Sequence, residues 1–296
     1  MKFVKPSVRL IAKTAPCDTE IRQWLTDIGC DKETASSYAF SKQKTTGERI
    51  VELAGRRCYN SFQTGLNPNV SRIRSDIAEY IKNILSSGHG SVLEHVYFTF
   101  AIENISRVCT GELNRHRAGV AISEGSMRYI RYVDIPIVET PLLTLTAEDM
   151  NDPELVKYLS TYSDEDISGL HSIAVKKQRT RQCIERFCIH VEQFYAELQS
   201  IWRDELKPES NFKFKKHITS LIRRIIPMGI ATGGVWTMNI RALRHVCTLR
   251  CSEAAEEEIA VVANRILEIM QETEPNLFGD FHANTKGYFE PEFRKV

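Results

Sequence analysis

The sequence predicts a mixed α/β (α+β) protein, and two observations support this prediction. The run Val96–Ile102 is rich in β-branched and aromatic residues, which favours a strand that is buried on at least one face. Several longer segments repeat apolar residues at intervals of three and four, which is typical of helices with one buried face. The chain of 296 residues shows no internal repeat, low-complexity tract or linker, so we predict a single domain over residues 1–296.

The composition is that of an ordinary soluble protein and excludes several functional classes. Net charge is +1, so no global field favours a nucleic-acid or membrane partner. No window is apolar enough for a membrane span or signal peptide, and we expect a cytoplasmic protein. The eight cysteines include no CxxC pair and have no partners at zinc spacing, so we expect reduced thiols and no metal site.

The first third of the chain alternates strand and helix signals. A short strand is expected at Val8–Ile11, and apolar stripes predict helices over Gly47–Phe62 and over residues 73–85. Gly88 is expected to end the second of these helices, because glycine is common just after a helix C-terminus. The strand Val96–Ile102 follows directly.

The middle of the chain is expected to carry one long packing helix between loops. Cys109–Asn114 should be a short helix, and residues 118–128 a loop that folds back over a site. Residues 132–165 contain many Asp, Pro and Thr residues and are expected to be surface connections. The clearest helical spacing covers residues 166–206, and Pro208–Lys216 should be a basic loop that ends this helix.

The last third is predicted to contain two helices. A glycine-rich connection is followed by a helix on which Arg241 and His245 share a face, with Asn239 just before it. A second helix is expected to begin with Ser252 as its N-cap and to end near Pro275.

A cluster of cationic and small residues is the first sign of a binding site. Arg115-His116-Arg117 is followed after eight residues by Ser126-Met127-Arg128. Arginine presents a planar fork of donors that suits phosphate oxygens, and Gly119 lets the backbone approach a ligand closely. An Arg-His-Arg triplet alone is also common on exposed helix faces, so the triplet by itself does not decide the function.

The full arrangement resembles the signature of the flavin-dependent thymidylate synthases, Arg-His-Arg followed by Ser-x-Arg. The stretch Gly88–His95 resembles a second motif of that family, and the segment from Asn239 to Arg250 resembles a third. The resemblance covers roughly residues 7–131 and 215–281. It implies a central sheet flanked by long helices, in a homotetramer whose sites are shared between subunits.

The resemblance also implies a reaction and its cofactors. The reaction is reductive methylation of dUMP at C5, in which bound FAD, NADPH and methylenetetrahydrofolate supply the reducing power and the one-carbon unit. Arg250 would be the catalytic residue, donating hydrogen bonds to the uracil ring. Flavin contacts are implied for His89, Ser91, Arg115, His116, Arg117, Glu124, Asn239, Arg241 and His245. Substrate contacts are implied for Glu112, Arg115, Glu124, Ser126, Arg128, Arg223 and Arg250.

The chain departs from the family pattern at positions that should line the site. These are Gly111, Asn114, Met127 and Ala254. They leave open a second interpretation, a flavin-dependent C5 methyl- or one-carbon transferase that acts on another pyrimidine nucleotide such as UMP. A third interpretation is a non-catalytic protein that binds nucleotides or nucleic acid. It predicts colourless protein whose binding to polynucleotides depends on salt.

Overall fold

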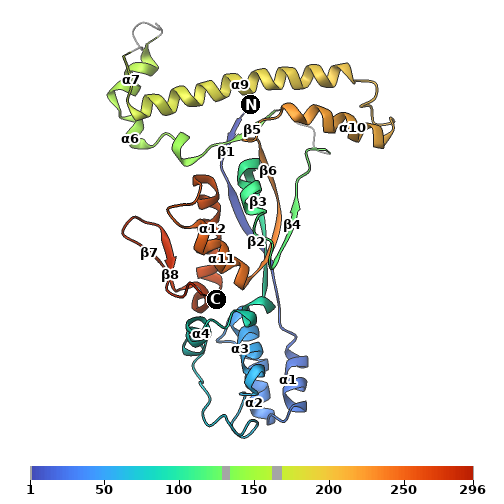
Figure 1. The fold of residues 1–296 in the computed structure, drawn as a ribbon, viewed down its shortest axis with the longest axis vertical. Helices are drawn as coiled ribbons and strands as arrows, with labels where there is room; N and C mark the ends of the chain where they lie inside the picture. The colour runs from blue at the N-terminus through green and yellow to red at the C-terminus, as the bar shows by residue number, and fades with distance from the viewer. Residues whose placement is uncertain (1, 129–133, 162–168, 296) are drawn as a thin grey trace. The chain divides into compact units, whose positions relative to one another are not determined.

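The computed structural model describes residues 2–128, 134–161 and 169–295, and it confirms a mixed α/β fold (Figure 1). Among these residues, strands form a four-stranded sheet in the order β2-β3-β6-β4, a parallel pair β1-β5 and an antiparallel pair β7-β8. The strand bounds are β1 Lys2–Val4, β2 Ser7–Lys13, β3 Tyr97–Ser106, β4 Val120–Glu124, β5 Pro136–Val138, β6 Ala231–Asn239, β7 Phe281–Ala283 and β8 Phe289–Pro291.

The helices differ widely in length, from single turns to the 29 residues of α9. The α-helices are α1 Asp18–Asp27, α2 Lys32–Ala39, α3 Thr46–Tyr59, α4 Ile77–Ser86, α5 Arg107–Leu113, α6 Ala147–Met150, α7 Pro153–Ser160, α9 Ile173–Ile201, α10 Phe212–Ile222, α11 Ile240–Arg250, α12 Glu257–Thr273 and α13 Pro275–Phe278. Short 3₁₀ turns are η1 Gly90–His95, η2 Pro141–Leu143 and η3 Arg223–Ile225.

The chain divides into two compact units, which we describe separately. Unit 1 comprises residues 1–7, 103–112 and 124–234, and unit 2 comprises residues 8–102, 113–123 and 235–296. Strands β3 and β6 contribute residues to both units. A single domain over residues 1–296 stays a prediction.

The strand β3 shows why the sequence signal at residues 96–102 is strong. Phe98, Phe100 and Ile102 alternate along the strand and are fully buried, as expected for one face of a pleated sheet. The strand begins one residue later than predicted and extends to Ser106, beyond the predicted end at residue 102. The prediction of a buried strand in this segment is therefore confirmed.

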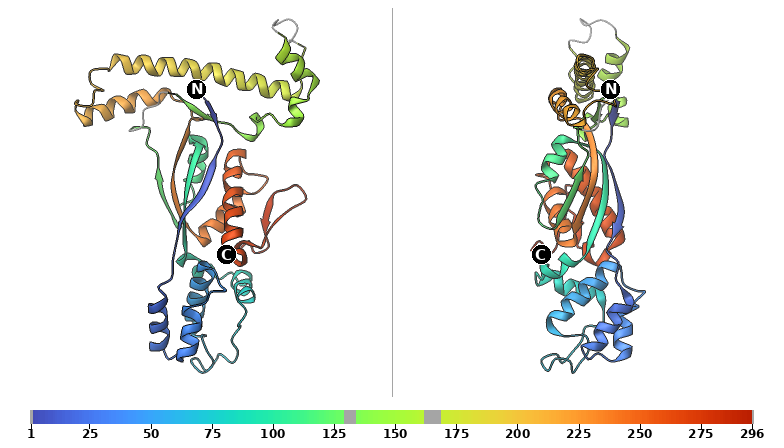
Figure 2. Two further views of the ribbon diagram at one scale, coloured as in Figure 1. Left: turned by 180° about the vertical axis from the view of Figure 1, so that it is seen from behind. Right: turned by 90° about the vertical axis from the view of Figure 1, so that its right-hand side faces the viewer.

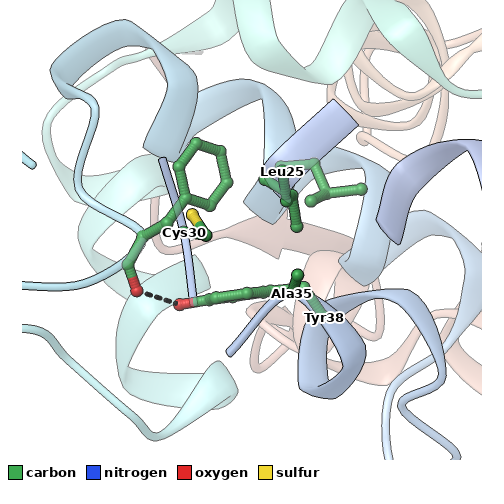
Figure 3. Packing of buried hydrophobic residues seen from close by; sticks show 6 residues of the cluster. Leu25, Cys30, Ala35 and Tyr38 are labelled. Atoms are coloured by element: carbon green, nitrogen blue, oxygen red, sulfur yellow. Dashed lines mark hydrogen bonds between the residues drawn. The ribbon is translucent and has the colours of Figure 1, made fainter. Parts of the chain in front are cut away.

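In unit 2, helices α1, α2 and α3 enclose a core cluster around Leu25, Cys30, Ala35 and Tyr38 (Figure 3). The Tyr38 hydroxyl donates to the Phe62 carbonyl oxygen at 3.2 Å, so the buried phenol has a partner. Helix α3 begins with a capping box between Thr45 and Glu48, which satisfies backbone donors at its N-terminus. This helix lies within about one to three residues of its predicted bounds.

In unit 1, the long helix α9 lies beside α10, as both views show (Figure 2). Cys188 and Val191 of α9 pack with Ile135, Ile137 and Ile230 in one apolar cluster. Further along α9, the side chain of Tyr195 is buried in a second cluster with residues of α10. Residues 166–168 of the predicted helix lie outside the described residues, and α9 itself is shorter than predicted.

Several segments predicted as loops are regular structure. Residues 120–124 form the edge strand β4 rather than part of a loop, and the glycine-rich connection is the first half of β6. Glycine lowered the strand signal there, because it has no side chain for packing. Helix α10 begins at Phe212, where the sequence predicted a basic loop through Lys216. Its N-cap Asn211 accepts from two backbone amides, so a polar residue starts the helix.

Two further expectations need correction. Within residues 134–161, expected to be surface connections, the structure has β5, η2, α6 and α7. Helix α12 begins at Glu257 with Glu256 as its N-cap, so Ser252 is not the cap. Helices as short as α6 and α7 contain too few apolar residues for a helical period to be recognised in the sequence.

Candidate functional site

Asn239 and Gly119 join the N-terminus of α11 to the start of β4 in unit 2. The Asn239 side chain accepts from the Ala242 amide at 2.8 Å and so caps α11. Its own backbone amide donates to the Gly119 carbonyl oxygen at 3.0 Å. Gly119 has φ +70°, and a Cβ at this position would lie 2.4 Å from Asn239 Nδ2. Only glycine fits this position without strain.

An open pocket of about 460 Å³ lies beside this junction. Arg241, on the first turn of α11, forms an ion pair with Glu94 of η1 at 2.6 Å. Both side chains are about half exposed, so the pair stays accessible to a ligand. The pocket is lined by Glu94, Tyr97, Ala118, Gly119, Asn239, Arg241, Ala242 and His245.

His116, His245 and Arg250 come together from two segments that are far apart in the sequence. The two imidazole rings meet edge to face with centroids 5.7 Å apart. Arg250 donates from Nε to His116 Nε2 at 3.2 Å. This bond requires His116 Nε2 to be unprotonated, which places the proton of the neutral ring on Nδ1.

Burial, together with the positive charge of Arg250 and the neighbouring His245, lowers the pKa of His116 to about 4. His116 is therefore neutral at physiological pH and accepts a hydrogen bond. A permanent cation is held by an uncharged acceptor, so the charge of Arg250 is not neutralised by this contact.

The flanking arginines of the triplet point outward. Arg115 and Arg117 are exposed, and no hydrogen bond or ion pair joins either side chain to another described residue. The adjacent Asn114 accepts from the Trp236 indole at 3.2 Å, which fixes the start of the triplet against β6. The two guanidinium groups are available to an anionic ligand.

His89 and Ser91 lie in other hollows of unit 2. His89 stacks on Tyr59 with ring centroids 6.2 Å apart and lines a hollow that also includes Arg72 and Arg74. Ser91 lines a third hollow, which also includes Trp24. The structure therefore does not bring His89 and Ser91 into the pocket of Asn239, Arg241 and His245.

In unit 1, the motif Ser126-Met127-Arg128 lies against α10. Arg128 donates from Nε to Ser220 Oγ at 3.0 Å, and the Thr219 hydroxyl donates to the Arg128 carbonyl oxygen at 2.8 Å. The Arg128 amide in turn donates to Ser126 Oγ at 3.3 Å. Arg223 follows Ser220 by three residues, as the C-cap of α10 and the first residue of η3.

Glu124 has a partner that the sequence did not reveal. Arg107, the first residue of α5, forms an ion pair with Glu124 and donates from Nη2 to the Gly125 carbonyl oxygen at 2.6 Å. Its backbone amide donates to the Met228 carbonyl oxygen at 3.0 Å. Glu112 lies at the other end of α5 and is partly buried. A lone arginine seventeen residues before a glutamate gives no sequence signal for this contact.

Comparison with known proteins identifies the family. The family model described as Thymidylate synthase complementing protein matches residues 42–276. A flavin-dependent thymidylate synthase from Corynebacterium diphtheriae is 32% identical over 87% of this chain and 89% of its own length. The chain belongs to the flavin-dependent thymidylate synthase family.

Another flavin-dependent thymidylate synthase, from Mycobacteroides abscessus, is 31% identical over 96% of this chain and 93% of its own length. A solved structure with a similar fold is the UMP/dUMP methylase PolB from Streptomyces cacaoi, bound with 5-Br UMP. Its TM-score is 0.58 at 16% identity, covering 94% of this chain and 95% of the other. This likeness supports the mixed α/β fold of the family.

The donor set of the α11 pocket fits part of a flavin. The half-exposed Arg241 can approach anionic oxygens, Tyr97 offers an aromatic ring, and Gly119 leaves backbone accessible. Together with the outward-pointing Arg115 and Arg117, these groups suit a ligand that has aromatic rings and phosphates, as a flavin dinucleotide of this family does. His89 and Ser91 lie outside this pocket.

The departures from the family pattern have different structural settings. Apart from its chain neighbours and the backbone of its own helix, no atom of a described residue lies within 4 Å of a Cβ built on Gly111, so this position leaves open space on α5. Met127 packs against the apolar cluster of Ile135 and Ile137, and Ala254 lies in an exposed turn after α11.

Within the described part of the chain, no helix combines the length and the apolar character that a membrane span requires.

Proposed function

We propose that this protein catalyses the reductive methylation of dUMP at C5 to dTMP, using methylenetetrahydrofolate and NADPH through bound FAD. The observation that carries this proposal is the Arg250–His116 contact within a chain of the flavin-dependent thymidylate synthase family. Because this acceptor is neutral, the contact with His116 orients Arg250 without cancelling its charge.

FAD, when bound, would supply the redox chemistry of the reaction. The protein supplies orientation and electrostatics. Asn239, Arg241 and His245 would bind the flavin at the α11 pocket, with Arg115, His116 and Arg117 beside it in the sequence motif. Glu124 would contribute from β4, and His89 and Ser91 would contact the flavin from their separate hollows.

Arg250 would act as the catalytic hydrogen-bond donor. Its Nε–H bond to His116 fixes the plane of the guanidinium, so the remaining donors have a set direction. Preorganised donors of this kind stabilise charge that develops on a ring carbonyl in the transition state. In this proposal, His116 positions Arg250 as well as contacting the flavin.

The substrate phosphate would bind the cationic groups of unit 1. Arg128 and Ser126 lie on one segment, and Arg223 lies at the end of the helix that holds Arg128. Arginine forks match phosphate oxygens in geometry and charge. Glu112 and Arg115 are proposed as further contacts to the nucleotide.

The protein would act as one domain in a cytoplasmic homotetramer with sites shared between subunits. The distribution of the proposed flavin contacts supports sharing, because His89 and Ser91 lie in hollows other than the α11 pocket of the same chain. In such an assembly, the hollow with His89 or Ser91 of one subunit would complete the flavin site at the α11 pocket of another subunit.

A second candidate substrate is UMP. The structurally similar PolB is named a UMP/dUMP methylase, and the chain departs from its family pattern at Gly111 and Met127. A site that hydrogen-bonds or excludes a 2′-hydroxyl discriminates strongly between the two nucleotides.

The test is tritium release from C5-labelled dUMP and, in parallel, from C5-labelled UMP. Purified protein would be supplied with FAD, NADPH and methylenetetrahydrofolate, and the methylated nucleotide would be identified by chromatography. Release from dUMP with formation of dTMP is expected. Release from UMP alone would establish the alternative substrate. A colourless protein that releases no tritium and binds polynucleotide in a salt-dependent manner would overturn the enzymatic proposal.

A further inference from the structure

A hollow of about 390 Å³ in unit 2 lies between α3, α4 and the segment that joins them. Three arginines and two tyrosines line it together with His89, and none of the described residues that line it is acidic. We call it the arginine hollow, and the side chains that decide its chemistry are Arg56, Tyr59, Arg72, Arg74 and His89. A lining of this kind suits a ligand that combines negative charge with an aromatic ring.

The buried Arg56 fixes the wall of the arginine hollow. Its guanidinium forms an ion pair with Glu52 at 2.8 Å, and both side chains are only 2% exposed. It also donates to the Ser61 carbonyl oxygen at 3.1 Å and to the Arg74 carbonyl oxygen at 2.6 Å. Because these carbonyls lie near the two ends of the segment between α3 and α4, Arg56 holds both ends against α3. Its own charge is matched by Glu52, so Arg56 has a structural role here.

Arg72 and Arg74 carry positive charge that is open to a ligand. Both residues are exposed, and no hydrogen bond or ion pair joins either side chain to another described residue. Asp76 follows Arg74 by two residues, but it does not line the hollow, and as the N-cap of α4 it accepts from the Glu79 amide at 2.7 Å. Two neighbouring guanidinium groups without an acidic partner favour an anion that can meet both of them.

Tyr59 adds an aromatic surface to the arginine hollow. Its ring stacks on His89 with centroids 6.2 Å apart and an angle of 16° between the planes, yet Tyr59 is still 54% exposed. The Tyr59 carbonyl oxygen accepts from Asn67 Nδ2 at 2.6 Å, which holds the end of α3 to the following segment. A half-exposed ring supported by an imidazole is a surface on which a planar heterocycle can stack.

Two co-substrates of the proposed reaction combine aromatic rings with negative charge, so the inference below rests on that proposed function. In NADPH a dianionic phosphate on the 2′-oxygen lies close to the adenine ring of the same nucleoside. In methylenetetrahydrofolate the carboxylates follow the aromatic rings along a flexible glutamate chain. Two guanidinium groups separated by a single residue and grouped with one stacked aromatic pair match the compact nucleoside phosphate. An arginine near the ribose is a general way of accommodating a 2′-phosphate.

We propose that the arginine hollow binds the 2′-phosphoadenosine end of NADPH, with Arg72 and Arg74 at the 2′-phosphate and Tyr59 against the adenine ring. Arg72 and Arg74 are then the residues that favour NADPH over NADH. His89 borders the same hollow and is one of the proposed flavin contacts. The hollow therefore lies beside a proposed flavin contact, as a site for the reductant of that flavin requires.

Calorimetric titration of the full-length protein tests the site without turnover. The protein is oxidised and holds FAD and dUMP in excess, so that the flavin and substrate sites are occupied, and the probes are 2′,5′-ADP and 5′-AMP. These two nucleotides differ only in the 2′-phosphate. The unchanged protein should bind 2′,5′-ADP at least about 10-fold more tightly than 5′-AMP. R72Q/R74Q should weaken binding of 2′,5′-ADP by about 10- to 100-fold and leave binding of 5′-AMP unchanged.

The matched control is R9Q/R265Q, which removes two exposed guanidinium groups of unit 2 outside the hollow. It should bind 2′,5′-ADP as the unchanged protein does, and circular dichroism should show the same fold in all three proteins. Equal affinity of the unchanged protein for the two nucleotides, or equal losses in R72Q/R74Q and the control, would overturn the site.

Tyr59→Leu tests the position of the adenine ring. It should weaken binding of 2′,5′-ADP and of 5′-AMP by the same factor, about 5- to 100-fold, because both nucleotides contain adenine. Unchanged binding of both nucleotides would contradict stacking of adenine on Tyr59.

Anaerobic reduction of bound FAD, followed by the loss of its visible absorbance, compares the two reductants. R72Q/R74Q should raise the KM for NADPH by about 10- to 100-fold and leave kcat unchanged. The KM for NADH should stay the same, because NADH has no 2′-phosphate. Equal losses with NADPH and NADH would contradict a role of Arg72 and Arg74 in the choice of reductant.

Methylenetetrahydrofolate with one glutamate and with several glutamates separates the second co-substrate from NADPH. R72Q/R74Q should leave the KM for both forms unchanged. A rise in KM for the polyglutamate form alone, with an unchanged KM for NADPH, would assign the arginines to folate carboxylates and overturn the proposal. Titration with 2′,5′-ADP needs no turnover, so a protein that binds this probe through Arg72 and Arg74 but methylates neither dUMP nor UMP would overturn the proposed reaction and keep the site.

Discussion

At the scale of single residues, the contact between Arg250 and His116 is the most informative feature of the candidate site. It joins the end of α11 to the Arg-His-Arg triplet within unit 2. The bond depends on a neutral imidazole, and burial provides that state by lowering the pKa of His116 to about 4. Catalysis and protonation can therefore be tested separately at these two residues.

Arg250→Ala should lower the turnover of dUMP by about 10²–10³-fold, because it removes a preorganised donor at a developing negative charge. Turnover measured by tritium release at saturating substrate checks this expectation, and absorbance of bound flavin checks that the cofactor is retained. Arg265→Ala is a suitable control, since Arg265 is an exposed arginine of α12 paired with Glu268. An equal loss in both variants would contradict the role of Arg250.

The low pKa of His116 predicts a loss of stability in acid. Above pH 6.5 the ring is neutral in both folded and unfolded chains, so it contributes no pH dependence. As the pH falls from 6.5 towards 4, the unfolded chain takes up a proton that the folded chain excludes, and the free energy of unfolding decreases. Urea unfolding at several pH values should show a smaller acid-induced decrease in the free energy of unfolding for His116→Gln than for the unchanged protein. If the free energy of unfolding depends on pH equally in both proteins, the pKa of His116 is not lowered.

Arg107 and Glu124 should act as a coupled pair. Both side chains are only 18% exposed, so removal of one charge leaves the other poorly solvated. A double-mutant cycle of Arg107→Met and Glu124→Gln, measured by urea unfolding, should give a coupling energy of about 0.5–3 kcal/mol. Because Arg107 also holds the Gly125 carbonyl oxygen next to Ser126, Arg107→Met should raise the KM for dUMP. Additive effects and an unchanged KM would show that the pair has no such role.

At the scale of secondary-structure elements, the α11 N-terminus and the start of β4 depend on each other. Asn239 caps α11 through its side chain, while its backbone amide holds Gly119. The residues around this junction, including Arg241 and His245, line the pocket proposed for the flavin. A change at Gly119 should therefore affect both the helix cap and cofactor binding.

Gly119→Ala should destabilise the protein by about 1–3 kcal/mol, because alanine is strained at φ +70° and its Cβ would meet the Asn239 side chain. Flavin affinity, measured by fluorescence titration, should fall with it. Gly111→Ala is the matched control, since this position lies in helix α5 with open space around it and alanine favours helix. Equal stability of the two variants would mean that the left-handed conformation at Gly119 is not required.

At the scale of the whole molecule, activity should depend on assembly. If each active site is formed by more than one subunit, dilution below the dissociation constant of the assembly separates the residues of that site. The specific activity of the unchanged protein should then fall over the same concentration range in which its mass falls in sedimentation velocity. FAD and both co-substrates are kept saturating, so loss of ligand does not explain the change. Constant specific activity through dissociation would show that each chain has a complete site.

The sequence by itself determined the family and the main secondary structure. Motifs of fixed spacing, such as Arg115-His116-Arg117 and the segment Asn239–Arg250, depend on local chain geometry and chemistry, so they are readable without a structure. The alternation in β3 and the spacing in α3 likewise reflect burial of one face of one element. Short elements such as β4 and the glycine-rich half of β6 carry too few apolar residues to be predicted.

Only the tertiary structure decided which of these residues meet. The Arg107–Glu124 pair and the Arg250–His116 bond join segments 17 and 134 residues apart, and no local pattern records such contacts. The same holds for α9: its sequence predicts an amphipathic helix, but exposure of Phe187 and Phe194 follows from what the rest of unit 1 covers. The periodicity of a sequence shows which face of a helix is apolar. Which segment covers that face depends on how distant parts of the chain pack.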